Sequence, residues 1–375
     1  MRDFLKYGEA SVLIDSQFGS TGKGLAAAYV HKHTKNVIDQ DRLVCITNAA
    51  PNAGHTTVTE DGTKFVTFHM PTMGVLCPNA MIFLNAGAII DIESLIKEVN
   101  TLRVNPRRVF IHINAAVITN EDKIKEKDAS SSQTRIASTQ KGVGAALSAK
   151  VARSGAVAKD HAKQLTDAGF KMFDGDINEL LVLGYAAMIE TPQGMSLSLN
   201  NGFYPYCTSR EVSVSQALSD AGVGPKSLHK VLATMRTFPI RVGNIAGTDG
   251  ETIGWSGPVY SDQDELNWEK NFPDVTPERT TVTQRIRRIF TFSRMQYREA
   301  LLRLQPDYVH VGFCDYFNNA GEFASFVSTL DQIESNSQTY PSRVYSFGPS
   351  VNDVMTYNEV GSWYDRRSRN GKEDH

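Results

Sequence analysis

The chain has 375 residues, and its 39 lysines and arginines nearly balance its 41 aspartates and glutamates, which leaves a formal net charge of −2 at pH 7. This balance gives no general reason to expect a nucleic acid or a membrane surface as a partner, and we expect neither. The length exceeds that of one ordinary core, but no linker interrupts the chain. We therefore predict one domain over residues 1–375 with loop insertions and a flexible tail from about residue 364.

The first strongly patterned segment is SVLIDSQFGSTGKGLAAAYVHKH at residues 11–33. An apolar run leads into a loop with three glycines, and an Ala-rich run of helix-forming residues follows. Such a loop offers the bare backbone N–H groups of a helix start to a phosphate, and Lys23 can add its ammonium. The alternative is a solvated lysine in the first turn of a helix. The spacing differs from the Walker A loop, because Gln17 replaces its first glycine and Gly24 replaces its Ser/Thr.

Short apolar runs rich in β-branched residues recur along the chain, with helical stretches between them. This alternation predicts an α/β fold with a large, mostly parallel central sheet, helices on both faces and functional groups at the carboxyl ends of the strands. The predicted strands are residues 11–14, 42–47, 64–70, 80–87, 108–113, 186–190, 308–313 and 343–348.

Two segments are polar and rich in turn-forming residues. Residues 121–141 are Ser-rich, and we expect a mobile surface loop there. Residues 244–283 form a second long polar stretch, which is typical of an active-site lid. The four cysteines, by contrast, lie far apart without C-x-x-C spacing, so we expect neither a zinc site nor a disulfide framework and favour a reducing cytoplasm.

His55 follows Asn52, Ala53 and Gly54 just beyond the predicted strand at 42–47. The small residues around it would let a ligand approach both the backbone and the imidazole, as a proton donor or charge stabiliser requires. A lone histidine is just as often structural, so the sequence leaves both interpretations open.

Further along, Ser138 and Thr139 precede a second glycine loop, and Arg153 falls on a predicted helix. A hydroxyl with an arginine grips phosphate well, because the guanidinium binds oxyanions with two parallel hydrogen bonds. Gln193 and Thr208 stand near a strand end and a turn, where they could orient a base or a phosphate. A surface arginine and ordinary turns are the alternatives.

The run TTVTQRIRRIF at residues 280–290 places Arg285, Arg287 and Arg288 near three threonines, which would suit a small dicarboxylate. Runs of this kind are more usually a solvated face.

Taken in chain order, these segments resemble adenylosuccinate synthetase, the purine-pathway ligase. The family motifs and their counterparts here are Q-W-G-D-E-G-K-G with Gln17–Gly24, N-A-G-H-T with Asn52–Thr56, T-T-G-R-G-I-G-P-A with Ser138–Ala146, K-V-A-R-R-G with Lys150–Gly155, Y-P-Y-V-T-S with Tyr204–Ser209, R-V-G with Arg241–Gly243, T-G-R-x-R-R with Thr283–Arg288 and S-T-G-P with Ser346–Pro349.

The resemblance implies a two-step ligation with Mg²⁺ as cofactor. The γ-phosphoryl group of a nucleoside triphosphate passes to O6 of a 6-oxopurine nucleotide, and the amine of L-aspartate then displaces phosphate at C6. It also implies a homodimer in which Arg153 reaches the nucleotide of the neighbouring subunit.

The resemblance also assigns roles to individual residues. The catalytic side chains would be Ser20, Lys23 and His55. The nucleoside triphosphate would bind Gly19, Ser20, Thr21, Gly22, Lys23, Gly24, Gly54, His55, Thr56, Asp315, Ser346, Gly348 and Pro349. The purine nucleotide would bind Ser20, Asn52, Ala53, Ser138, Thr139, Arg153, Gln193, Thr208, Val242 and Gly243. L-Aspartate would bind Thr281, Val282, Thr283, Arg285 and Arg287, and Mg²⁺ would be ligated by Ser20 and the Gly54 carbonyl.

One departure from the family concerns the general base of the reaction. Ser20 stands where the family has an Asp that ligates Mg²⁺ and removes the N1 proton of inosine monophosphate. A serine hydroxyl cannot act as that base unaided, but it leaves room for an amine at C2, as in guanine. The chain is similar in this respect to the phage-type 2-aminoadenylosuccinate synthetases, so we expect dGMP as the substrate and, for a phage gene, the host cytoplasm as the location.

A second departure concerns the phosphoryl donor. The family recognises GTP with T-K-L-D, where this chain has Gly312–Asp315. Phe313 replaces the Lys that packs on guanine, while Asp315 is kept. We therefore expect ATP or dATP as the donor, with GTP still possible in principle.

Three other functions compete with a dGMP ligase that forms N6-succinyl-2-amino-2′-deoxyadenylate. The runner-up is the ordinary synthetase using inosine monophosphate and GTP. A silent nucleotide-binding protein would have no physical need for Lys23, His55 and the arginine run. A simple P-loop ATPase or kinase would not explain that run, and aspartate-dependent phosphate release separates the two.

Overall fold

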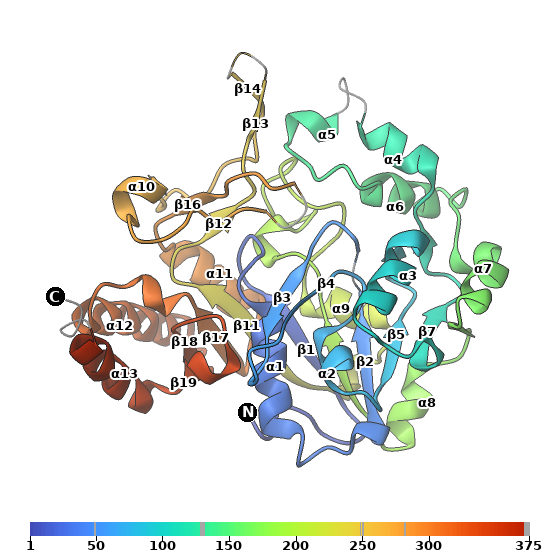
Figure 1. The fold of residues 1–375 in the computed structure, drawn as a ribbon, viewed down its shortest axis with the longest axis horizontal. Coiled ribbons are helices and arrows are strands. Elements are labelled where there is room, and N and C mark those ends of the chain that lie inside the picture. The colour runs from blue at the N-terminus through green and yellow to red at the C-terminus, as the bar shows by residue number, and fades with distance from the viewer. Residues whose placement is uncertain (49, 128–131, 248, 250, 281–282, 371–375) are drawn as a thin grey trace.

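A computed structural model describes residues 1–48, 50–127, 132–247, 249, 251–280 and 283–370, with backbone only at 132 and 365–370 (Figure 1). Within these residues, one ten-stranded sheet crosses the molecule. Nine of its strands run parallel, and only β19 at one edge is antiparallel to its neighbour. In spatial order they are β19 (Val354–Met355), β18 (Ser342–Ser346), β17 (Tyr308–Gly312), β11 (Leu228–Arg236), β1 (Ala10–Asp15), β10 (Ala186–Glu190), β2 (Leu43–Thr47), β5 (Met81–Leu84), β7 (Val109–His112) and β9 (Lys171–Phe173).

Helices cover both faces of the sheet, because both faces of each central strand are apolar. In β1, Val12 and Ile14 enter one core and Leu13 enters the other. One core is closed by α8 (Ile177–Val182), α9 (Val214–Ala221), α11 (Arg294–Leu304), α12 (Ala320–Ser337) and α13 (Tyr357–Asn370). The other is closed by α1 (Lys23–Thr34), α2 (Thr72–Leu76), α3 (Ile92–Thr101) and α7 (Ala162–Asp167). The predicted α/β fold class is therefore confirmed.

One of the strand predictions needs correction. Residues 64–70 were expected in the central sheet, but β4 (Lys64–Thr67) pairs only with β3 (His55–Val58) as an antiparallel hairpin. Its side chains are mostly exposed or half-buried, which a strand inside a doubly covered sheet would not tolerate. Three strands of the central sheet were not predicted: β9 and β19 at its edges, and β11, which lies between β1 and β17.

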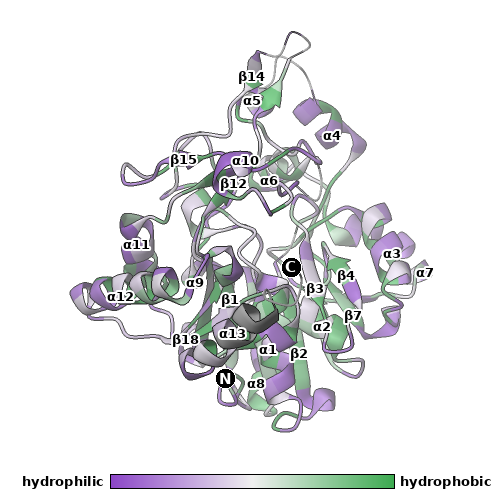
Figure 2. Ribbon diagram, turned by 60° about the vertical axis from the view of Figure 1, so that its left-hand side comes forward, coloured by the Kyte–Doolittle hydropathy of each residue, from purple (hydrophilic) through white to green (hydrophobic). Residues whose placement is uncertain are grey.

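The remaining elements are small, and Figure 1 shows β13, β14, α4, α5 and α6 at the top of the molecule. Figure 2 shows the apolar strands at the centre and polar residues along α4 above them. These elements are the β3–β4 hairpin, β6 (Ile89–Ile90) with β8 (Ala116–Val117), β12 (Ile240–Arg241) with β16 (Arg288–Phe290) and β15 (Glu265–Leu266), β13 (Ile245–Ala246) with β14 (Thr252–Gly254), and the helices α4 (Asn120–Lys127), α5 (Ser132–Arg135), α6 (Val143–Val151) and α10 (Trp268–Asn271).

The loop expected at residues 121–141 is wrong for residues 121–127 and 132–135, which form α4 and α5, whereas residues 136–141 belong to no helix. The reason is long-range: the buried carboxylate of Glu126 accepts hydrogen bonds from Gly142 N at 2.7 Å, Gly144 N at 2.8 Å and Ala145 N at 3.2 Å. A carboxylate at the N-terminus of α6 satisfies N–H groups that have no partner within the helix. Arg153 was expected on a helix, but α6 ends at Val151 and Arg153 has a φ of 63°.

No helix in the described part of the chain is both long enough and apolar enough to cross a membrane.

A substitution at Gly24 tests the close packing of α1 on the β3–β4 hairpin. A Cβ there would lie 2.5 Å from the Thr56 carbonyl oxygen and 2.5 Å from Thr57 Oγ1, so the helix and the hairpin cannot both stay in place. We expect Gly24→Ala to lower the free energy of unfolding by about 1–3 kcal/mol, measured by urea denaturation. Gly361→Ala in α13 is the matched control, because a Cβ there meets nothing within 4 Å. Equal changes in the two variants would contradict this packing.

Candidate active site

A cavity of about 770 Å³ opens where the central strands end, a size that suits nucleotide-like ligands. Its wall comes from segments far apart in the sequence, as expected at the carboxyl edge of a parallel sheet. The segments are the glycine loop after β1, residues 52–55 after β2, the stretch 133–148, Gln193 after β10, residues 204–209 and parts of the 241–287 region.

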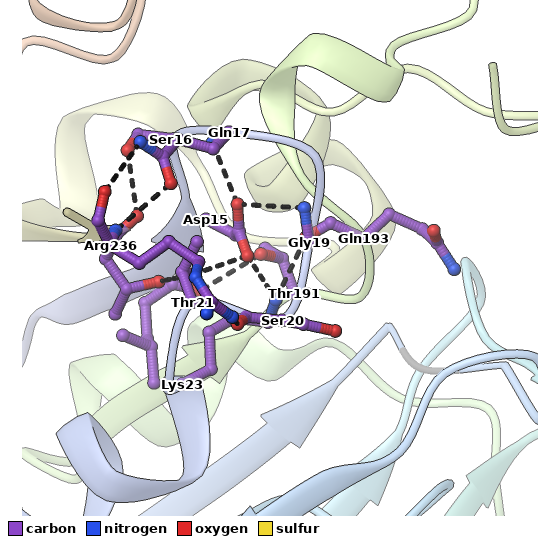
Figure 3. A network of polar contacts seen from close by, with 12 residues as sticks. Asp15, Ser16, Gln17, Gly19, Ser20, Thr21, Lys23, Thr191, Gln193 and Arg236 are labelled. Atoms are coloured by element: carbon purple, nitrogen blue, oxygen red, sulfur yellow. Dashed lines mark hydrogen bonds and ion pairs between the residues drawn. The ribbon is translucent and has the colours of Figure 1, made fainter. Parts of the chain in front are cut away.

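The glycine loop is built around the carboxylate of Asp15, the last residue of β1, which is fully buried. Oδ1 accepts from Gln17 N at 2.8 Å and Gly19 N at 3.3 Å, and Oδ2 accepts from Thr21 Oγ1 at 2.5 Å and Lys23 Nζ at 3.3 Å (Figure 3). One side chain therefore fixes both limbs of the loop. Sequence reasoning missed it, because Asp15 reads only as the polar end of an apolar run.

The loop ends in an open helix start. Gly22 has a φ of 89° and no side chain caps α1, so the first N–H groups of the helix remain available to an anion. Lys23 is almost fully buried, and its Nζ also donates to the Gln193 carbonyl at 3.0 Å. The predicted phosphate site therefore has its cation and its N–H groups in place.

Close packing explains another glycine beneath this loop. A Cβ on Gly194 would lie 2.5 Å from Asp15 Oδ1 and 2.5 Å from Gly19 N. The turn after β10 therefore supports the glycine loop from below, and a side chain at this position would push the loop out of place.

His55 begins β3 and lines the cavity with Lys23. Burial, and secondarily the charge of Lys23, lowers the pKa of His55 to about 3. The imidazole of the ligand-free protein is therefore neutral near pH 7, with one N–H that can donate a hydrogen bond. A bound anion would raise its pKa and favour the charged form.

Of the residues assigned to the purine nucleotide, eight line the cavity: Ser20, Asn52, Ala53, Ser138, Thr139, Gln193, Thr208 and Val242. Asn52 Oδ1 is buried and has no hydrogen-bond partner among the described residues. A buried acceptor of this kind is normally satisfied, so a ligand donor at this point would complete it. Gly243 and Arg153 do not line the cavity, and Arg153 is exposed on the surface.

Residues predicted for the triphosphate divide into two groups. Gly19, Ser20, Lys23, Gly54 and His55 line the cavity, whereas Thr21, Gly22, Gly24, Thr56, Asp315, Ser346, Gly348 and Pro349 do not. The Thr21 hydroxyl points beneath the loop, toward Asp15 and Thr234. The last four residues follow β17 and β18, beside the loop: a Cβ on Gly312 would lie 3.5 Å from both the Thr21 carbonyl oxygen and Ser346 Oγ.

The predicted aspartate segment contacts the predicted nucleotide segment. Arg285 Nε donates to Thr283 Oγ1 at 3.0 Å, and its Nη2 donates to the Ala137 carbonyl at 2.9 Å. Arg287 lines the cavity, and burial lowers its pKa to about 10, which still leaves it charged near neutral pH. Thr281 and Val282 lie outside the described residues.

Sequence reasoning missed Arg241 as a structural support of the cavity. Its buried guanidinium lies 4.6 Å from the ring centroid of Phe18 and donates to the Tyr206 carbonyl at 2.8 Å and the Pro258 carbonyl at 2.7 Å. It thereby joins the glycine loop to two other walls. The R-V-G motif includes this position, but only Val242 and Gly243 were assigned to the purine nucleotide.

The sequence profile of adenylosuccinate synthetase matches residues 12–181 and 175–323. The chain belongs to the adenylosuccinate synthetase family. The N6-succino-2-amino-2′-deoxyadenylate synthase of Acinetobacter phage SH-Ab 15497 is 38% identical over 95% of both chains. The adenylosuccinate synthetase of Methanococcus aeolicus is 34% identical over 75% of this chain and 77% of its own.

Solved structures of adenylosuccinate synthetase relatives share this fold. The succinoaminodeoxyadenylate synthetase of cyanophage S-2L, bound to dGMP and to dATP as an energy donor, is 32% identical with a TM-score of 0.81 over 96% of this chain and 99% of its own. The fully ligated adenylosuccinate synthetase of Plasmodium falciparum is 17% identical, with a TM-score of 0.70 over 92% and 99% of the two chains.

The Asp15–Lys23 ion pair yields a test of how this family member holds its glycine loop. Asp15→Asn keeps the side-chain shape but leaves the buried ammonium without its counter-charge, so we expect the free energy of unfolding at pH 7 to fall by about 3 kcal/mol. Asp167→Asn is the control, because its pair with Lys163 is exposed and should contribute less than about 1 kcal/mol. Chemical denaturation of both variants decides, and equal losses would contradict a structural role for Asp15.

Proposed function

We propose that the chain joins L-aspartate to dGMP at C6, with hydrolysis of a nucleoside triphosphate, and forms N6-succinyl-2-amino-2′-deoxyadenylate. The observation that carries the proposal is the cavity wall around Ser20. Among the described residues, Glu126 is the only carboxylate that lines the cavity, and it is held by the N-terminus of α6. Asp15 lies close to Lys23, but it is fully buried beneath the loop in an ion pair with it. Ser20 therefore stands on the cavity wall where the family has an Asp, and it leaves room for the C2 amine of guanine.

The reaction balances in two steps. The O6 of dGMP attacks the γ-phosphorus, its N1 proton passes to solvent or to a phosphate oxygen, and the nucleoside diphosphate leaves. The unprotonated aspartate amine then adds at C6 and loses one proton to solvent, and phosphate departs with the former O6. Phosphoryl transfer depends mainly on positioning and charge neutralisation, which Lys23 and the open start of α1 would supply.

His55 would act on O6, the oxygen that leaves C6 with the phosphate. It stands neutral beside Lys23 in the ligand-free protein. Phosphate oxygens bound next to it would raise its pKa, so that it could donate a hydrogen bond or a proton to the oxygen that leaves C6.

Mg²⁺ would enter with the triphosphate rather than reside in the protein. No group of three or more metal-binding side chains exists among the described residues. Ser20 Oγ and the Gly54 carbonyl would offer two neutral oxygens, which fits an ion that keeps most of its bonds to phosphates and water. When bound, the ion would neutralise charge on the β- and γ-phosphates.

The size and polarity of position 20 favour guanine. Ser20 lines the cavity with an exposed side chain that is shorter than Asp and uncharged, so an exocyclic amine at C2 would fit beside it. The second candidate is the ordinary reaction with inosine monophosphate and GTP. It is favoured by Asp315, which remains at the end of β17 where the family recognises guanine.

ATP or dATP is the proposed donor, because Phe313 replaces the Lys that packs on guanine in the family. Phe313 has a φ of 62°, and its ring is stacked against the Arg236 guanidinium at 3.7 Å. The cyanophage relative with bound dATP supports this choice.

The proposed assembly is a homodimer of one-domain subunits. Strands between Ala10 and Met355 share one sheet, which supports a single domain. Arg153 is exposed outside the cavity of its own chain, where it would be available to a nucleotide in a neighbouring subunit.

Phosphate release by the purified protein tests this function. With ATP, Mg²⁺ and aspartate, turnover should occur with dGMP and be much slower with inosine monophosphate, and it should vanish when aspartate is omitted. Lys23→Ala serves as the control for contaminating enzymes. Turnover with inosine monophosphate alone would show that the protein catalyses the ordinary adenylosuccinate synthetase reaction. Phosphate release that does not depend on aspartate would indicate a simple ATPase.

Ser20→Asp tests the specificity assignment. The larger, charged side chain should lower kcat/KM for dGMP by about tenfold or more, which corresponds to about 1.4 kcal/mol. It should improve the relative use of inosine monophosphate, which has only hydrogen at C2 and does not need the space that the larger side chain would fill. Steady-state kinetics with both nucleotides measure the ratio; an unchanged ratio would rule out Ser20 as the determinant.

Proton uptake tests the role of His55. Because its ligand-free pKa is about 3, a rise on binding means that nucleotide binding takes up a proton as the pH falls toward the bound-state pKa. Calorimetry at pH 6 in buffers of different ionisation enthalpy measures this uptake. We expect a fraction of a proton for the native protein and none for His55→Asn; equal uptake in both would show that another group titrates.

A further inference from the structure

Arg236, the last residue of β11, is a fully buried cation that contacts three regions of the active site. Its backbone is paired with the Gln17 side chain, through Arg236 N to Gln17 Oε1 at 3.0 Å and Gln17 Nε2 to the Arg236 carbonyl at 3.2 Å. Its Nη1 donates to the Ser20 carbonyl at 3.4 Å. Figure 3 shows the guanidinium lying against the glycine loop.

The second contact leads to the chain just before residues 281–287, the segment proposed to bind L-aspartate. Both oxygens of Glu278 accept from the guanidinium, Oε2 at 3.1 Å from Nη1 and Oε1 from Nη2. Burial alone would raise the pKa of Glu278, but the charge of Arg236 holds it below its ordinary value. The Glu278 carbonyl accepts from Arg287 N at 2.8 Å, so this ion pair fixes the start of the chain that carries the cavity-lining Arg287.

The third contact leads to residues 312–315, which correspond to the family's recognition site for the base of the phosphoryl donor; we call them the donor-base segment. The face of Arg236 is covered by the Phe313 ring at 3.7 Å, and the Tyr316 hydroxyl donates to Glu278 Oε1 at 2.8 Å. Thr237 Oγ1 donates to the Phe313 carbonyl at 2.6 Å, which holds this ring in place over the guanidinium. A nucleobase that binds beside Phe313 would therefore displace the ring against Arg236, the residue that also contacts the Ser20 carbonyl and Glu278.

We propose that Arg236 is a positioning residue that couples occupancy of the donor-nucleotide site to the affinity of the aspartate segment. The inference rests on the proposed function, because that function assigns substrates to the segments. A buried ion pair with two good hydrogen bonds changes geometry as a unit, so a shift of Phe313 is passed to Glu278 rather than absorbed by solvent. The coupling would order the reaction, since aspartate would bind well only when a phosphoryl donor is present.

The test is a pair of calorimetric titrations with L-aspartate, both at saturating dGMP, with and without the non-hydrolysable donor AMP-PNP. For the native protein we expect AMP-PNP to tighten aspartate binding at least fivefold. Arg236→Lys keeps the charge but loses the planar fork and the stacking surface, so the ratio should fall below twofold. Its dGMP dissociation constant should stay within threefold of the native value, which a general collapse of the cavity would not allow.

Arg343→Lys is the matched control. Arg343 lies on β18, next to the edge strand β19, and it also pairs with two carboxylates, those of Asp331 and Glu334 in α12. It should keep the native ratio. If Arg236→Lys does not fold, Phe313→Leu decides, because it removes the ring and keeps the ion pair, and it should also lose the coupling. Native coupling in the variant that is measured, or no coupling in the native protein, would overturn the inference. Absence of aspartate-dependent turnover in the native protein would instead overturn the proposed function.

Discussion

The buried carboxylate of Asp15 is the constraint on which the active site depends. Four donors converge on it, and they belong to both limbs of the glycine loop and to the first residue of α1. A buried charge is tolerated only when it is paired and hydrogen-bonded, so the loop must keep the conformation that supplies those partners. That conformation exposes the N–H groups of the helix start and holds the Lys23 ammonium beside them. Neighbouring strands complete the support, with Gly194 packed below and Thr234 bonded to Thr21.

The order of the strands explains how segments from distant parts of the chain reach one cavity. β1 lies between β10 and β11, so the glycine loop stands between Gln193 on one side and Arg236 on the other. β2 next to β10 brings residues 52–55 alongside, while β17 and β18 carry the donor-base segments beyond Arg236. The glycine loop, residues 52–55, Gln193 and the segments after β17 and β18 each follow a different strand of the central sheet. The parallel direction of those strands places these segments at the same edge. Lys23 is held by Asp15 and the Gln193 carbonyl before any ligand binds, and the backbone N–H of Arg287 is held by the Glu278 carbonyl. The chemistry would then rest on charges that the fold has already positioned.

The sequence predicted those features that are set by local chemistry. The glycine loop, the start of α1 and the parallel sheet follow from glycine spacing, helix-forming residues and apolar runs, and the structure confirms them. The features that were missed depend on contacts between distant residues. Within residues 121–141, the Glu126 carboxylate faces the N–H groups of α6, and no local pattern reveals such a pairing. Asp15 and Arg236 are charged residues at strand ends, which ordinarily indicates a boundary, and only the assembled sheet shows that both are buried. The roles assigned to single residues came from family resemblance, and they stay predictions, most of all for Thr281 and Val282.

The most direct measurement follows the oxygen at C6. dGMP carrying ¹⁸O at position 6 would be turned over with unlabelled ATP and aspartate in unlabelled water, and the released phosphate would be analysed by mass spectrometry. Phosphorylation of O6 followed by displacement by the aspartate amine predicts one ¹⁸O atom in each phosphate formed. Unlabelled phosphate, with the heavy oxygen found in water or kept on the nucleotide, would contradict a 6-phosphoryl intermediate and with it the role given to Lys23, His55 and the glycine loop.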